Sequence, residues 1–147
     1  MVASAESLWV GVDPGKTGGI VVLDSQGRYV AHSTIPLVGV GTKRARVDCR
    51  AIKAWWLEVT LKGRWHVRPS MVTWAIERVS SAPTDGVVGA FSFGKATGAI
   101  FAFAETMGFA ITEISPKDWQ KVWLLADAGL IGATARLVEM AASVPKP

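Results

Sequence analysis

The sequence predicts an α/β fold built on a mixed β-sheet with helices on both of its faces. Three observations support this prediction. The chain opens with short apolar segments joined by tight turns, its later apolar segments alternate with stretches of helical periodicity, and half of its 147 residues are hydrophobic. Turn-linked strands pair antiparallel, whereas strands separated by a helix usually pair parallel. We see no repeat and no linker, so we expect a single domain over residues 1–147.

The first three strands are predicted from the apolar segments near the amino terminus. Leu8–Asp13, Ile20–Leu23 and Tyr29–Ile35 are short and rich in β-branched or aromatic residues. The segments between them, Pro14–Gly19 and Asp24–Gly27, contain the residues that tight turns require. These strands should therefore form an antiparallel meander.

A basic segment separates this meander from the first predicted helix. Residues Leu37–Val47 are rich in glycine and basic side chains and show no periodicity, which predicts a loop. Asp48 can cap a helix over Cys49–Leu61, where apolar residues recur every three or four positions.

The second half of the chain alternates strands and helices. Met71–Glu77 is predicted as a strand, and Val87–Met107 as a long helix that is apolar nearly all round, ended by Gly108. Such a helix should be covered on more than one side. The remaining predicted elements are a strand over Phe109–Ile114, a short helix from Pro116 through Trp123, and a last helix over Ala126–Ala142.

The composition excludes several kinds of protein. One cysteine, Cys49, cannot form an internal disulfide and fits a reducing cytoplasm, and one Cys with two scattered His predicts no zinc site. The apolar runs are interrupted within about ten residues, short of the roughly 20 that span a bilayer, so we expect no membrane segment. No signal peptide is visible. The net charge of +4 is compatible with binding to nucleic acid but does not by itself indicate such binding.

Two acidic residues end predicted core strands. Asp13 follows the apolar run LWVGV, and Glu77 follows VTWAI. A carboxylate at such a position is costly to desolvate unless it is paired or binds a metal ion. One such acid is most simply explained as a cap for the following turn, but two at corresponding ends favour a shared metal site.

Five segments, in order, resemble motifs of RuvC-type Holliday junction resolvases, which have an RNase H-like fold. The segments are GVDPGKTGG from Gly11, AIE from Ala75, FSFGKATG from Phe91, SPKDWQ from Ser115 and ADA from Ala126. The resemblance covers roughly residues 8–137. It departs from the family where relatives usually carry a fourth acid near the last helix, because Leu124 stands there.

This resemblance implies a magnesium-dependent endonuclease that cuts four-way DNA junctions. Asp13, Glu77 and Asp127 would be the catalytic, metal-binding residues, with Asp13 on the central strand as the shared ligand. Mg²⁺ prefers carboxylate oxygens, and Mn²⁺ could substitute for it. The protein would act in the cytoplasm of a bacterium or of a phage-infected cell. Two symmetric cuts call for a homodimer, which the helix Val87–Met107 could form through Phe101 or Phe103.

Several basic and aromatic side chains could contact the DNA. Lys43, Arg44 and Arg46 lie in the basic loop, and Lys16 and Lys95 lie inside the motifs. Phe91 and Phe93 could insert between bases, although core packing is the commoner role. The alternative functions are a phosphate-binding domain of the ASKHA type, which acts in pairs on a nucleotide, a nucleic-acid-binding module without catalysis, and a plain RNase H or transposase domain.

Overall fold

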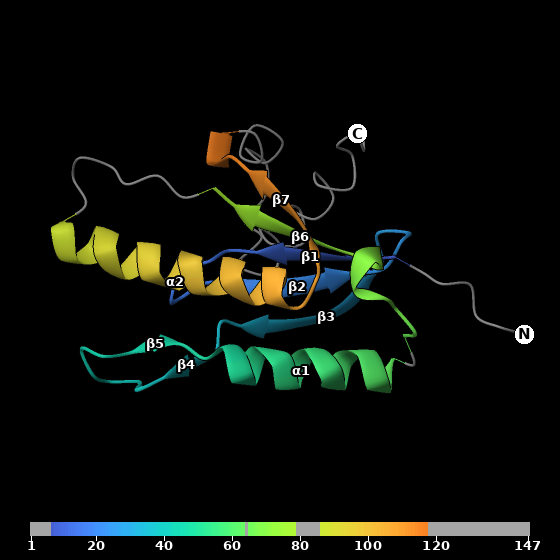
Figure 1. The fold of residues 1–147 in the computed structure, drawn as a ribbon, viewed down its shortest axis with the longest axis horizontal. Coiled ribbons are helices and arrows are strands. Elements are labelled where there is room, and N and C mark those ends of the chain that lie inside the picture. The colour runs from blue at the N-terminus through green and yellow to red at the C-terminus, as the bar shows by residue number, and fades with distance from the viewer. Residues whose placement is uncertain (1–6, 64, 79–85, 118–147) are drawn as a thin grey trace, which may run out of the picture.

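The computed structural model describes residues 7–63, 65–78 and 86–117. Five strands form one sheet in the order β3-β2-β1-β6-β7 (Figure 1). Their bounds are β1 Leu8–Val12, β2 Gly19–Leu23, β3 Tyr29–Thr34, β6 Val72–Glu77 and β7 Ala110–Ile114. The first three pair antiparallel, and β6 pairs parallel with both β1 and β7. The mixed sheet predicted from the sequence is confirmed, with β1 at its centre.

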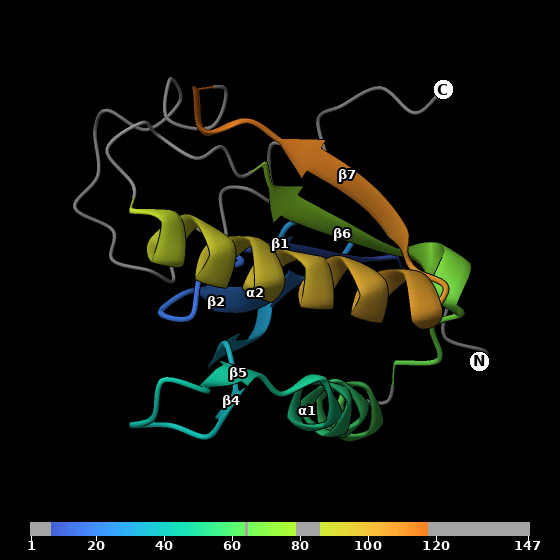
Figure 2. The ribbon, with the colours of Figure 1, turned by 60° about the vertical axis from the view of Figure 1, so that its left-hand side comes forward.

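Two long helices, α1 (Cys49–Lys62) and α2 (Val87–Thr106), cover the same face of this sheet (Figure 2). Asp48 caps α1 as predicted, because its Oδ1 accepts hydrogen bonds from the backbone N–H groups of Arg50 and Ala51, each at 3.1 Å. The predicted helices that would cover the other face begin at Pro116. Pro116 and Lys117 are helical, and the rest of those elements lies outside the described residues.

The core between the helices and the sheet is aromatic near its centre. Trp74 of β6 stacks on Phe109, with ring centroids 5.5 Å apart and planes inclined by 11°. Trp56 of α1 and Phe103 of α2 pack against this pair, with centroids 5.2 to 6.5 Å from their ring neighbours. Such ring pairs add to the free energy of apolar burial. They therefore hold both helices against β6.

The turn between β2 and β3 is stabilised by Asp24, the residue that follows β2, which is only 3% exposed. Its Oδ1 accepts from the N–H groups of Gln26 and Arg28 at 2.9 Å, and its Oδ2 accepts from the Arg28 guanidinium at 2.6 Å. Burial raises the pKa of Asp24, but these hydrogen bonds and the guanidinium charge outweigh burial and leave the pKa below its ordinary value. Asp24 is therefore an ionised turn-forming residue.

The helix α2 differs from its prediction in how it is covered. It buries Ala96, Ile100, Phe103 and Ala104, whereas Val88 is 83% exposed and Phe91 is 69% exposed. The expectation that α2 is covered on several sides is therefore wrong for its amino-terminal turns. Although Gly, Ser and Lys interrupt its apolar runs as expected, α2 is long and apolar enough to cross a membrane by length and composition alone. Core helices pass that test too, and the buried side of α2 packs on the sheet.

The segment predicted as a loop contains a small hairpin. β4 (Leu37–Val38) pairs antiparallel with β5 (Arg46–Val47), and the hairpin extends toward the amino end of α2 (Figure 1). A short 3-10 helix, η1 (Pro69–Met71), was also not predicted. Strands of two residues and a single 3-10 turn are too short to produce a periodic signal, which explains why both were missed.

Candidate active site

Asp13 and Glu77 lie at the same end of two neighbouring parallel strands. Val12 of β1 pairs in register with Ile76 of β6, and each acid is the next residue along its chain. Adjacent strands are about 5 Å apart, so the two backbones bring the carboxylates to one place. Both residues are partly exposed, which leaves them accessible to an ion or a substrate. The structure thus brings together two of the three acids expected to form the site.

A tight glycine turn fixes the backbone around Asp13. The Asp13 N–H donates to the Gly19 carbonyl at 3.0 Å, and the Gly18 N–H donates to the Gly15 carbonyl at 2.9 Å. The Gly15 N–H donates to Oδ1 of Asp13 at 3.3 Å. A Cβ on Gly18 would lie 2.1 Å from the Asp13 carbonyl oxygen, so only glycine fits there. The turn therefore orients the Asp13 side chain through its own backbone.

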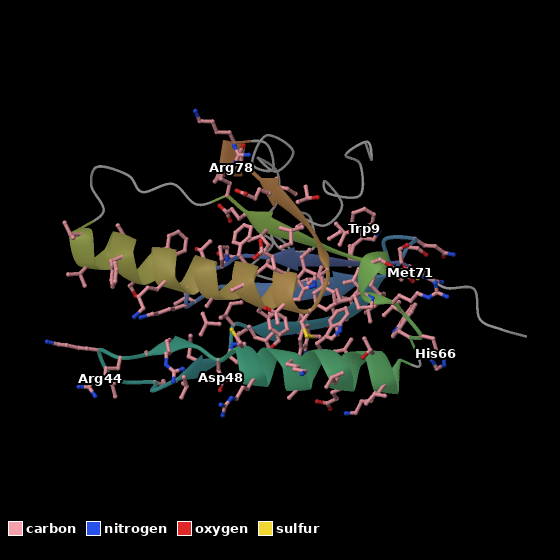
Figure 3. The ribbon with its side chains drawn as sticks, viewed as in Figure 1. Trp9, Arg44, Asp48, His66, Met71 and Arg78 are labelled. Atoms are coloured by element: carbon pink, nitrogen blue, oxygen red, sulfur yellow. The ribbon has the colours of Figure 1, made fainter. Side chains whose placement is uncertain are left out.

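Glu77 is held by the pairing of β6 with β7. It lies in register with Ile114, and the following N–H, that of Arg78, donates to the Ile114 carbonyl at 2.7 Å. The Arg78 guanidinium lies 3.6 Å from Glu113, in an exposed pair that contributes little to stability. Arg78 follows Glu77 directly in the chain, and its exposed side chain lies just beyond the carboxyl end of β6 (Figure 3). Sequence reasoning missed Arg78, although its position immediately after Glu77 was a usable signal.

The expected DNA-binding lysines and arginines lie around the same end of the molecule. The carboxyl ends of β1 and β6, the amino end of α2 and the hairpin β4–β5 all point the same way (Figures 1 and 2). Arg44 lies near the tip of this hairpin (Figure 3). Lys16 is partly exposed in the glycine turn, and the exposed members are Lys43, Arg44, Arg46 and Lys95. Positive charge of this kind suits a phosphate backbone.

The two phenylalanines expected near the DNA have different surroundings. Phe91 is 69% exposed, and the Lys95 ammonium lies 5.6 Å from its ring centroid, within cation–π range. Phe93 is half-buried, and its Cε2 lies 3.4 Å from the point that a Cβ on Gly15 would occupy. Of the two, Phe91 remains available to a base, whereas Phe93 packs against the glycine turn. Sequence reasoning could not separate these roles.

The donor set of the described site fits a hard divalent cation. Asp13 and Glu77 offer carboxylate oxygens, and magnesium is commonly held by one or two carboxylates together with water and substrate phosphate. Asp127, the third expected ligand, lies outside the described residues. Within residues 7–63, 65–78 and 86–117, no group of three His, Cys, Asp or Glu side chains is placed to hold a metal ion. The two acids are therefore the part of the site that the fold itself defines.

Comparison with solved structures identifies the architecture. Thermus thermophilus RuvC, in a complex with Holliday junction substrate, matches with a TM-score of 0.57 at 15% identity, covering 92% of this chain and 93% of that one. The chain has a RuvC-like fold. A second Thermus thermophilus RuvC structure matches at 19% identity, a TM-score of 0.45 and about the same coverage, 89% of this chain and 90% of that one. No protein-family model and no curated protein matches the sequence.

The RuvC-like fold accounts for the position of the acids. An open sheet with parallel neighbours exposes functional residues at the carboxyl ends of its strands, and Asp13 and Glu77 occupy those ends of β1 and β6. At this level of identity the match establishes the fold only. The chemistry has to be argued from the residues themselves.

Proposed function

We propose that this chain is a metal-dependent endonuclease that resolves four-way DNA junctions by paired, symmetric phosphodiester hydrolysis. The observation that carries the proposal is the placement of Asp13 and Glu77 on adjacent parallel strands of a RuvC-like fold. The matched Thermus thermophilus protein was solved with a Holliday junction substrate. The exposed basic side chains at the same end of this chain add support.

The residues have distinct parts in the proposed reaction. Asp13, Glu77 and Asp127 would hold Mg²⁺, or Mn²⁺ in its place. A bound divalent ion supplies an acidified water as nucleophile and neutralises charge on the leaving oxygen. Lys16 and Lys95 would hold the scissile strand beside the acids, while Lys43, Arg44 and Arg46 would grip a phosphate backbone further away. The exposed ring of Phe91 could stack on an unpaired base at the branch point.

Paired cuts require two sites, so the proposal includes a homodimer. Phe103 is part of the core, where it packs against Trp74 and Phe109, which excludes it as an interface residue. Phe101 is only partly buried, and Val88 and Phe91 on the same helix are exposed. Phe101→Asp should therefore give monomers with little paired cutting. A wild-type chain that sediments as a monomer at micromolar concentration would count against the dimer.

A cleavage panel tests the enzymatic proposal against its rivals. The wild-type chain in Mg²⁺ should cut a four-way junction symmetrically and leave linear duplex and RNA–DNA hybrid intact. Junction binding without cutting would indicate a non-catalytic nucleic-acid-binding module. Cutting of the hybrid would indicate a plain RNase H, and ATP hydrolysis would indicate an ASKHA-type domain.

A further inference from the structure

The ring of Phe93 is held against the turn that carries Asp13. Phe93 belongs to the amino-terminal part of α2, and its Cε2 lies 3.4 Å from the Cβ position of Gly15. The helix behind it is fixed to the sheet, because Ala96 and Ile100 one and two turns later are buried in the core. The ring therefore lies beside the turn on a helix that the core anchors.

The turn is built to accept that ring. Gly15 has no side chain where Phe93 approaches, and the φ of Gly15 does not lie in the left-handed region, so its backbone conformation does not itself demand glycine. Phe93 Cε2 and Asp13 Oδ1 lie 3.4 and 3.7 Å from the Cβ position of Gly15, so the ring and the carboxylate both border this glycine at contact distance. At Gly18, by contrast, the turn's own backbone leaves no room for a Cβ and requires glycine.

The contact reaches the Asp13 carboxylate through one peptide group. The Gly15 N–H donates to Oδ1 of Asp13 at 3.3 Å, a long hydrogen bond that a small outward movement of Gly15 would break. The Phe93 ring lies on the side of Gly15 toward which a Cβ would project, so it limits movement of Gly15 in that direction. A carboxylate offers about four lone-pair sites, so one bond to Gly15 restrains its rotation and leaves other sites for a cation.

We propose that Phe93 is a positioning residue that seats the Asp13–Gly18 turn and thereby keeps the Asp13 carboxylate in the orientation that binds a divalent cation. This inference rests on the proposed function, in which Asp13 is a metal ligand. Outer groups that orient metal ligands typically change metal affinity by about 10- to 100-fold when removed. We expect the effect of Phe93 on metal affinity to lie at the lower end of this range, because Phe93 influences the Asp13 carboxylate only through the turn.

Calorimetric titration with Mn²⁺, without DNA, tests the proposal directly. Phe93→Ala should weaken Mn²⁺ affinity about tenfold, and Phe93→Leu, which keeps a branched apolar side chain, should restore most of it. Met107→Ala is the matched control, since it removes another partly buried apolar side chain, at the opposite end of α2 from the turn. Its Mn²⁺ affinity should equal that of the wild type.

Two further measurements separate positioning from folding. Amide hydrogen exchange of Gly18, whose N–H bonds Gly15 across the turn, should be faster in Phe93→Ala. Gly15→Ala places a methyl group 3.4 Å from the ring, at contact distance, so alone it should leave Mn²⁺ affinity near that of the wild type. Combined with Phe93→Leu, it should recover part of the affinity that Phe93→Leu loses, because it fills space beside the smaller side chain. If Phe93→Ala is unfolded, Phe93→Leu and this double-variant comparison decide the question.

The outcomes distinguish this proposal from the proposed function. If Asp13→Asn loses Mn²⁺ binding while folded Phe93→Ala keeps wild-type affinity, Phe93 does not position the ligand and only this inference fails, even if Gly18 exchange is faster. If Asp13→Asn binds Mn²⁺ as the wild type does, or if the wild type binds none, the metal assignment fails and this inference fails with it.

Discussion

Gly18→Ala should destabilise the protein because the turn around Asp13 has no room for a methyl group. The Cβ would lie 2.1 Å from the Asp13 carbonyl oxygen and 2.8 Å from the Gly15 carbonyl oxygen. Both are backbone atoms, so no side-chain rotation relieves the clash. The turn has to open by about 1 Å to restore ordinary van der Waals contact.

The size of the expected loss in stability follows from the hydrogen bonds that such an opening of the turn breaks. The bond from Gly18 N–H to the Gly15 carbonyl is 2.9 Å long, and that from Asp13 N–H to the Gly19 carbonyl is 3.0 Å long. Each contributes about 1 kcal/mol, and a buried group left unpaired costs about 1–3 kcal/mol. Because Gly18 and Gly19 are buried, we expect a loss of about 2–4 kcal/mol in the free energy of unfolding.

Urea unfolding followed by tryptophan fluorescence measures this loss, and a second glycine provides the control. Gly98 lies within α2, and a Cβ built on it meets nothing within 4 Å. Gly98→Ala should therefore stabilise the protein by about 0.5–1 kcal/mol, through helix propensity and a less flexible unfolded chain. A Gly18→Ala variant within about 0.5 kcal/mol of the wild type, an effect typical of uninvolved surface positions, would refute the turn geometry described above.

Three further predictions concern charge. Asp13→Asn should abolish junction cleavage while junction binding survives, because it removes a metal-binding charge at nearly constant volume; wild-type nicking by this variant in Mg²⁺ would contradict the site. Replacing Lys43, Arg44 and Arg46 by Gln should weaken binding to all DNA structures alike and reduce the salt slope by about one per lost phosphate contact, measured by titration at several salt concentrations. Asp24→Asn should cost about 1–3 kcal/mol at neutral pH. Because the folded pKa of Asp24 lies below the ordinary value of 3.8, its contribution is complete above that pH and is lost as the pH falls through the folded pKa, so Asp24→Asn should flatten the acid limb of a stability–pH curve.

The main strands and helices could be predicted because their signals are local. Apolar runs bounded by Gly, Pro and Asp marked β1, β2 and β6, and the Asp48 cap marked the start of α1 within one residue. The hairpin β4–β5 was missed because two-residue strands carry no alternation. The exposure of Val88 and Phe91 was missed because composition shows that a helix is apolar all round, not which of its turns extend past the sheet.

The candidate site could be predicted only in part. Asp13 and Glu77 were found because an acid at the end of a buried strand is unusual in any sequence, and parallel pairing then brings such ends together. The contact of Phe93 with Gly15 depends on the angle at which α2 crosses the sheet, which no local pattern encodes. The prediction that Asp127 is the third ligand stays a prediction, since that residue lies outside the described part of the chain.

The position of β1 in the sheet has a consequence for how the protein folds. On one side β1 pairs with β2, its immediate neighbour in sequence, and on the other with β6, which follows only after α1. Loop closure makes the near pairing fast and the distant parallel pairing slow. We therefore expect the turn around Asp13 to form early in refolding and the two-acid pair to be completed late. In a stopped-flow experiment, Mn²⁺ binding should appear with the slow phase that docks β6, and its appearance with the earliest phase would contradict this order.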